Sequence, residues 1–465
     1  MGEADMKLDL KKFLGKKDTD MTQGNIIKQL LSFAVPMLIG LLFQVLYNTV
    51  DTMVVGKFVS KQALAAVGCN SSIINTIVGV FSGLATGASV VISQAYGAKD
   101  AERLSRAVHT TCLLTLYLCV VGTAAGLLAA RPLLKITNTA EDVMEDAMTY
   151  LLIYFAGLTG VLVYNMGSGI LRAVGDSTSP VIFLIVSALT NIVLDLAFVL
   201  LFHMGVAGVA WATVISQLLS SVLVVNTLMK ADVSYRLYPK KLRIHGDVLK
   251  DTMRLGLPSA IQSGVTSFSN VFVQAYINSF GSDGMAGWSA YNKLDSFLTV
   301  PVMAIAMAST TFVGQCWGAK MKERARKGSN QALLMSFAVT VVFAIVYVVL
   351  ARPLVLMFAN AEDAEVVEYG TYFIRWITPF YPLICFNQIY SGSLRGIGNA
   401  IAPTVIMLSS FVVFRQIYLF VFSKLLGGGQ LVITLAYPIG WVLCSVLISI
   451  CYFRSKLYRD DEALA

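Results

Sequence analysis

The sequence predicts an all-α membrane protein that crosses the bilayer twelve times, as two pseudo-symmetric bundles of six helices. Of its 465 residues, 56% are hydrophobic and only 13% are charged, which is unlike the balance of a soluble protein. Charge-free stretches recur along the chain, and several can cross a hydrocarbon core of ~30 Å as a helix. The second half of the sequence also repeats short motifs of the first half in the same order.

The first apolar segment, at 28–58, has 22 uncharged residues before it reaches Asp51. Pro36 and Gly40 can bend or loosen this helix, so we assign them as a hinge. Its polar residues are spaced i, i+3, i+4 and i+7 and so share one helix face: Gln44, Tyr47, Asn48 and Asp51. An acid within a membrane span marks a functional site, although an acid near the helix end can also reach headgroup water.

The remaining segments divide the chain into two lobes joined by a basic linker. We expect an N-terminal tail at 1–26, a first lobe at 27–230, a linker at 231–250, a second lobe at 251–454 and a C-terminal tail at 455–465. The predicted helices lie at 27–55, 63–95, 104–130, 142–167, 174–201, 207–230, 251–280, 286–315, 325–350, 364–390, 400–423 and 430–454.

Basic residues predict the orientation of these helices. The tails and alternate connections hold 26 of the 35 Lys and Arg residues, and the opposite loops hold six. By the positive-inside rule both termini are cytoplasmic, in a multi-pass protein of the cell's inner (plasma) membrane. The Lys-rich start lacks the apolar core of a signal peptide.

Other classes of function find little support. The seven cysteines occur singly, without metal-ligand or disulfide spacing, so we expect no metal site and no cofactor. The three histidines are far apart and lack a hydrolase or metalloprotease context, which argues against an enzyme. The net charge of +8 follows from the loop bias and requires no nucleic-acid partner.

The internal repeat is visible in three pairs of motifs. ISQAYGAKDAER at 92–103 returns as VGQCWGAKMKER at 313–324, and ARPLL at 130–134 returns as ARPLV at 351–355. LRAVGDSTSP at 171–180 returns as LRGIGNAIAP at 394–403. Parallel repeats of this kind are typical of transporters whose substrate site lies between the halves near the bilayer midplane.

The two copies differ in their acids. The stripe of the first helix returns in the seventh as Thr266, Ser269 and Asn270, but Val273 takes the place of Asp51. Asp195, which shares a helix face with Asn191, aligns near Tyr418. Chemistry that uses protonation is therefore predicted for the N-terminal half.

These residues also carry a resemblance to a known family. YNTVDTMVVG, GILRAVGD with its echo, NIVLD and the repeated Q-(A/C)-(Y/W)-G-A-K element resemble the MATE family (multidrug and toxic compound extrusion transporters), most closely its DinF-like prokaryotic branch. The resemblance extends from about residue 25 to about residue 453. It implies the MATE fold, alternating access, and cation-driven export of organic, often cationic, compounds by a protein that works as a monomer.

The branch has a polar cluster of two aspartates with tyrosine, asparagine and threonine side chains in its first lobe. Ser168 stands where the branch often has a second asparagine, which changes an amide ligand to a hydroxyl. The matching positions, which we expect to couple transport to a cation, are Asp51, Tyr150, Asn165, Asn191, Asp195 and Thr213, together with Ser168.

We expect proton-coupled antiport of small organic cations or drugs, with sodium as the alternative coupling ion. Protonation of Asp51 would let the first helix repack near Pro36 and Gly40. Asp295, within SAYNKLDSF, could line the second-half cavity, paired with Lys293 or Arg415, or it could be an interfacial charge. The predicted substrate cavity comprises Gln44, Tyr47, Asn48, Gln262, Thr266, Asn270, Asp295 and Arg415.

A lipid or lipid-linked sugar flippase of a related superfamily is the main rival. An arginine-lined cavity around Arg375 and Arg415 would favour the flippase, whereas the paired acids of the first half favour the drug exporter.

Overall fold

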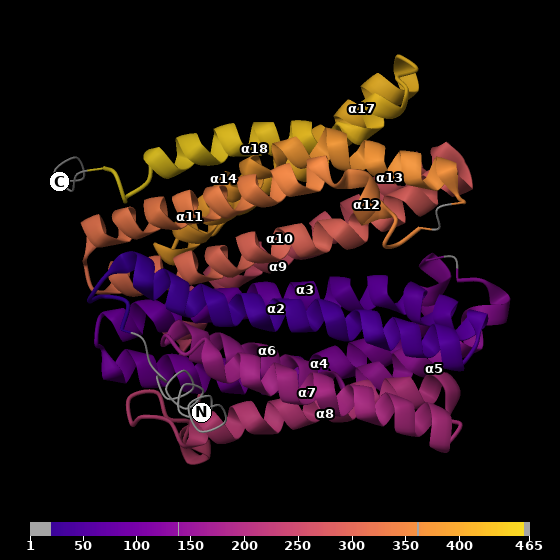
Figure 1. Ribbon diagram of the computed structural model, residues 1–465. Coiled ribbons are helices and arrows are strands. Elements are labelled where there is room, and N and C mark those ends of the chain that lie inside the picture. The colour runs from indigo at the N-terminus through magenta and orange to yellow at the C-terminus, as the bar shows by residue number, and fades with distance from the viewer. Residues whose placement is uncertain (1–19, 138, 360–361, 460–465) are drawn as a thin grey trace, which may run out of the picture. The chain divides into compact units, whose positions relative to one another are not determined.

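The computed structural model describes residues 20–137, 139–359 and 362–459, and every regular element within these ranges is a helix (Figure 1). The predicted all-α fold is therefore confirmed. The first half forms α2 (Ile26–Phe58), α3 (Lys61–Gly97), α4 (Ala101–Ile136), α5 (Glu141–Ala156), α6 (Leu158–Ala173), α7 (Thr178–Leu196), the π-helical segment η1 (Ala197–Leu201) and α8 (Gly205–Met229).

The second half has the same order of helices but more breaks, and a short 3₁₀ turn, η2 (Pro239–Lys241), lies in the linker before it. It forms α9 (Gly246–Ile277), η3 (Asn278–Phe280), α10 (Gly281–Gly318), α11 (Lys322–Val349), α12 (Ala351–Val355), α13 (Ala364–Ile377), η4 (Thr378–Phe380), α14 (Tyr381–Gly396), α15 (Ile401–Leu408), η5 (Ser409–Phe414), α16 (Arg415–Tyr418), η6 (Leu419–Leu425), α17 (Gln430–Thr434) and α18 (Ala436–Phe453).

All twelve predicted spans have a helical counterpart. In the described part of the chain, nine helical stretches are long and apolar enough to cross a membrane, and the pair α5 and α6, bent by 49°, adds a broken span. One of the nine, Gly246–Gly318, contains both α9 and α10. The pair α13 and α14 occupies the predicted tenth span. The protein is therefore a multi-pass membrane protein.

The chain forms two compact units, each of which includes the opening of the other half's first helix. Among the described residues, Val35–Ala260 belong to unit 1, and Thr22–Ala34 belong to unit 2 with the residues from Ile261 onward. The changes of unit fall beside Pro36 in α2 and Pro258 in α9. The lobe boundaries drawn from the sequence follow the repeat and stay predictions.

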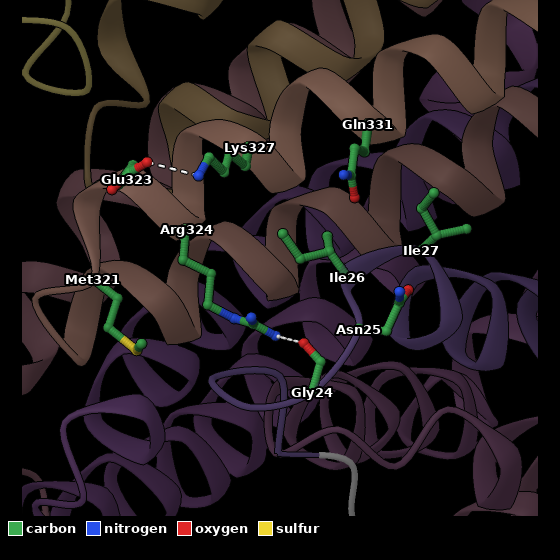
Figure 2. A pocket seen from close by; sticks show the side chains of 9 residues that line it. All are labelled: Gly24, Asn25, Ile26, Ile27, Met321, Glu323, Arg324, Lys327 and Gln331. Carbon is green, nitrogen blue, oxygen red and sulfur yellow. Dashed lines mark hydrogen bonds and ion pairs between the residues drawn. The ribbon is translucent and has the colours of Figure 1, made fainter.

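Within unit 2, Arg324 at the start of α11 holds the opening turn of α2. Its Nη2 donates to the backbone carbonyls of Gln23 and Gly24 and to Oε1 of Gln29, each at 2.9 Å. Figure 2 shows Arg324 reaching Gly24 at the edge of a pocket of about 450 Å³. This pocket contains none of the predicted site residues.

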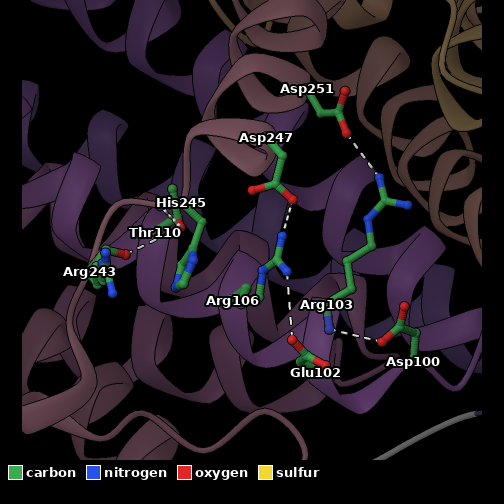
Figure 3. Close-up of polar contacts among 9 residues, drawn as sticks. All are labelled: Asp100, Glu102, Arg103, Arg106, Thr110, Arg243, His245, Asp247 and Asp251. Atoms are coloured by element: carbon green, nitrogen blue, oxygen red, sulfur yellow. Dashed lines mark hydrogen bonds and ion pairs between the residues drawn. The ribbon is translucent and has the colours of Figure 1, made fainter.

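Within unit 1, two arginines of α4 hold the opening turns of α9 (Figure 3). Arg103 donates to Asp251 Oδ2 at 2.9 Å, and Arg106 pairs with Asp247. Arg103 and Arg324 are equivalent in the repeat, since they stand 221 residues apart in matching motifs. Each half therefore uses the same position to anchor the start of the helix that opens the other half.

The repeated sequence motifs encode turns. Lys99 and Lys320, which follow α3 and α10, have φ values of 55° and 59°, and Gly175 and Gly398 have φ values of 97° and 89°. After each of these glycines, a side-chain oxygen caps the next helix. Asp176 Oδ1 accepts from the backbone N–H groups of Thr178 and Ser179, and Asn399 Oδ1 accepts from that of Ala402.

Two glycines of α3 let the backbone of α9 approach closely within unit 1. A Cβ atom on Gly83 would lie 2.3 Å from the backbone nitrogen of Ala260, and one on Gly87 would lie 2.3 Å from that of Gly256. Because the obstructing atoms are backbone atoms, a side chain at either glycine requires the two helices to separate.

Candidate functional site

Asp51 and Asp195 form the centre of a buried polar site in unit 1. Asp51 lies on α2 and is 9% exposed, and Asp195 lies near the end of α7 and is fully buried. The two carboxyl groups interact with each other. Oδ1 of each has no hydrogen-bond partner among the described residues. The predicted pairing of the two acids from separate helices is therefore seen in the structure.

Asn191 connects Asp195 to α8. In the amide orientation that satisfies both of its polar atoms, Asn191 donates to Asp195 Oδ2 at 3.1 Å. In the same orientation its carbonyl oxygen accepts from the backbone N–H of Thr213 at 3.2 Å. Asn191 is fully buried and stands one helical turn before Asp195, so the i, i+4 spacing places both side chains on one face.

Two tyrosines enclose the acid pair from α2 and α5. The phenol groups of Tyr47 and Tyr150 both interact with the Asp51 carboxyl and with the Thr213 hydroxyl. Tyr150 is 5% exposed and belongs to the hydrophobic core of unit 1. Tyr154, one turn after Tyr150, also lies beside these phenols. Tyr154 was not among the residues predicted from the sequence, although its i+4 relation to Tyr150 could have indicated it.

The helix that carries Asp195 changes its winding directly after the acid. α7 ends at Leu196 and continues as the π-helical segment η1. Single π-helical turns widen a helix, leave backbone groups less regularly bonded and are frequent at functional sites. The amino-acid composition around Asp195 does not mark this break.

Asn165 and Ser168 of α6 make contacts elsewhere. Asn165 Nδ2 donates to the carbonyl of Val161 in its own helix at 2.8 Å. Ser168 is fully buried and lies beside the Tyr164 hydroxyl. The described contacts do not join either residue to the acids, so their expected role in cation coupling stays a prediction.

The remaining polar residues of the α2 face and the hinge pair have different surroundings. Gln44 and Asn48 are exposed, as a cavity-lining role requires. Pro36 lies buried inside α2, and a Cβ atom on Gly40 would lie 2.8 Å from Val181 Cγ2 of α7. Gly40 therefore permits close packing of α2 on α7, the helix that carries Asp195.

In unit 2, Gln262 of α9 faces α15. Its Oε1 accepts from Thr404 Oγ1 at 3.3 Å, and its Nε2 lies 3.0 Å from Met407 Sδ. Thr266, one turn further along α9, is half-buried. Both positions stay predictions as cavity residues.

Asp295 binds tyrosines, and the pairing expected from the sequence is wrong. Asp295 Oδ1 accepts from the Tyr381 hydroxyl and lies 3.5 Å from that of Tyr291. Lys293 instead lies over the Phe358 ring at 5.5 Å, and no ion pair joins Asp295 to Lys293 or Arg415 among the described residues. For Lys293 the cause is geometric, because residues i and i+2 point to different faces of a helix. Arg415 instead donates to Ser269 and Asn270 of α9.

Arg415 is buried against the polar stripe of α9. Its Nη2 donates to Ser269 Oγ and to Asn270 Oδ1, both at 2.9 Å, and its guanidinium lies over the Tyr437 ring at 4.8 Å. Arg375, the other arginine considered for a basic cavity, is exposed on α13.

A two-repeat, multi-pass membrane protein with buried acids inside its helices has the architecture of a membrane transporter. The chain belongs to the MatE family, whose model matches residues 36–197 and again residues 258–421. The two matches start 222 residues apart and confirm the repeat. The DinF-like branch stays a prediction.

Similar proteins agree with this assignment. The chain is 29% identical to "Probable multidrug resistance protein YpnP" of Bacillus subtilis, over 95% of this chain and 99% of that protein. It is 26% identical to "Probable multidrug resistance protein NorM" of Thermotoga maritima, over 87% and 88%. A solved outward-facing multidrug resistance MATE family transporter matches with a TM-score of 0.87 and 25% identity, over 94% and 97%.

Proposed function

We propose that this protein exports organic compounds, including cationic drugs, in exchange for protons that bind at Asp51 and Asp195. The observation that carries the proposal is the buried pair of interacting acids, in which two oxygens have no hydrogen-bond partner among the described residues. No basic side chain lies within ion-pair distance of either acid in the described part of the chain.

The physical cost of this arrangement favours bound protons. An ionised acid inside a membrane span costs roughly 2.5–3.5 kcal/mol or more. A second negative charge beside it raises the cost further, because like charges disfavour ionisation. The pair therefore holds protons when it is enclosed and releases them when its surroundings become wet or a cation replaces them.

Exchange follows because protons and the organic cation compete for the negative charge of the acid pair. Proton loss creates a negative site beside the exposed polar face of α2, and this charge attracts an organic cation. Proton binding removes the attraction and releases the substrate. Since Gly40 packs α2 tightly on α7, repacking of α2 near Pro36 would also shift the helix that carries Asp195.

The range of substrates is inferred from the relatives. Two of them are described as probable multidrug resistance proteins, and their matches extend over most of this chain. We infer export of chemically diverse organic compounds from the cell, across the inner (plasma) membrane, with both termini in the cytoplasm. The bias of Lys and Arg between the loops supports this orientation.

Ethidium efflux from proteoliposomes tests the proposal. With an imposed pH gradient and no sodium, the wild-type protein should drive efflux, and Asp51→Asn should lose it because an amide cannot exchange a proton. Asp142→Asn is the matched control, since Asp142 is an exposed acid in the first turn of α5.

Two results would change the proposal. Efflux that requires sodium would keep the site but replace the coupling ion. Gradient-driven efflux by Asp51→Asn at the wild-type rate would exclude Asp51 as the coupling acid.

A further inference from the structure

Arg415 is a buried cation in unit 2 that has no acidic partner within the described ranges. Its side chain is 4% exposed, and no carboxylate lies within 4.0 Å of it among the described residues. Its Nε is buried and donates no hydrogen bond to any residue that the structure describes. An uncompensated charge inside a membrane span is costly and is usually retained for binding.

The helix around Arg415 is distorted on both sides. The π-helical segment η5 ends at Phe414, directly before Arg415, and η6 begins at Leu419, one turn after it. π-helical turns of this kind are frequent at functional sites. This second observation is independent of the charge, and it marks the same position.

The repeat relates this arginine to the acid site of unit 1. Arg415 precedes Tyr418, the counterpart of Asp195, by less than one helical turn, and it binds Asn270, the counterpart of Asn48. In both units the equivalent helix carries a charge next to a π-helical segment and faces the polar stripe of the unit's first helix. The sign of the charge is negative in unit 1 and positive in unit 2.

We propose that Arg415 forms a subsite for an anionic group, a carboxylate or phosphate, of a transported organic compound. A ligand oxygen that accepts from Nε would satisfy the unpartnered donor and supply the missing negative charge. Asn270 accepts a hydrogen bond from the Arg415 guanidinium and is itself exposed. A ligand that displaces the Asn270 side-chain carbonyl can therefore reach Arg415. Aromatic ligands could in addition pack beside the Tyr437 ring.

The inference extends the proposed function, since it names a second chemical class of substrate for the same transporter. Acidic and zwitterionic compounds would bind through Arg415, whereas purely cationic compounds would depend on the acid pair of unit 1. The subsite is a property of unit 2 alone and does not require that protons drive transport.

Rhodamine B and its ethyl ester are a matched pair of probes, because they share the cationic dye and differ in a free carboxylate. Binding is measured by fluorescence on the purified full-length protein in uncharged detergent, without an ion gradient. Wild-type protein should bind rhodamine B about tenfold or more tightly than the ester. Arg415→Gln should remove this preference, and a melting temperature close to that of wild type would show that the variant is folded.

Two further variants separate the guanidinium from charge alone. Arg415→Lys keeps a cation but lacks Nε, and it should retain only part of the preference. Lys424→Gln removes an exposed cation from η6 and should bind both dyes like wild type.

Three results would overturn the proposal: equal affinity of the wild-type protein for both dyes, an unchanged preference in Arg415→Gln, or Arg415-dependent binding of phosphatidylglycerol with none of rhodamine B. The binding experiment and the efflux experiment fail independently. Loss of pH-driven efflux with intact dye discrimination would reject proton coupling and keep the subsite.

Discussion

At the scale of single residues, the acid site depends on amide and phenol groups that hold the carboxyl groups in place. Asn191 bridges Asp195 and the backbone of Thr213, and both tyrosine hydroxyls lie beside the same threonine. The i, i+4 spacing of Asn191 and Asp195 could be read from the sequence, because it requires only a helix. Contact of these residues with Asp51 requires α2 and α7 to pack together. That packing could be expected only from the family resemblance.

Other contacts of the charged residues could not be predicted from spacing. Asp295 accepts hydrogen bonds from the hydroxyl groups of Tyr291, in its own helix, and of Tyr381 in α14, 86 residues away. Tyr291 stands one turn before Asp295 and could have been found by its i−4 relation. Tyr381 gave no such signal, because its approach depends on the packing of α14 on α10.

Asn191→Ala should slow pH-driven ethidium efflux by about tenfold, because it removes a buried amide donor from Asp195. The initial rate in proteoliposomes measures this effect. Asn226→Ala is the matched control, since Asn226 is exposed on α8. Equal rates for wild type and Asn191→Ala would show that the amide does not support the site.

At the scale of helices, the sequence predicted where spans lie better than where they break. Apolar length located all twelve, but the bend between α5 and α6 and the π-helical segments η1, η5 and η6 have no distinct composition. Such breaks depend on packing and on buried charges within the folded unit. The paired turns after α3 and α10 were marked in the sequence by their repeated motifs.

Close contact of α3 and α9 in unit 1 depends on glycine. Gly87→Ala should lower the free energy of unfolding by about 1–3 kcal/mol, because the added Cβ meets the backbone of Gly256. Gly68→Ala lies on the same helix, and no atom of the described part of the chain lies within 4 Å of the added Cβ. It should leave stability unchanged or raise it by about 0.5–1 kcal/mol. Thermal unfolding in detergent compares the two variants, and equal melting temperatures would contradict the close contact.

At the scale of the whole molecule, a duplicated architecture carries two different charges. Offsets of 221 to 223 residues relate the helices, turns and caps of the two halves, and these could be found by comparing the sequence with itself. The same comparison showed that the second half lacks the acids. It did not show that Arg415 would be buried against Ser269 and Asn270, since that contact joins residues about 145 positions apart.

The most direct test of proton exchange through the acid pair measures proton movement itself. Proteoliposomes without sodium are loaded with the pH dye pyranine and with tetraphenylphosphonium, and their membrane voltage is clamped. As the cation leaves, the luminal pH should fall further with wild-type protein and with Asp142→Asn than in protein-free vesicles. With Asp51→Asn it should fall no further than in protein-free vesicles. Cation exit without acidification in the wild type, or equal acidification in Asp51→Asn, would contradict proton exchange at Asp51 and Asp195.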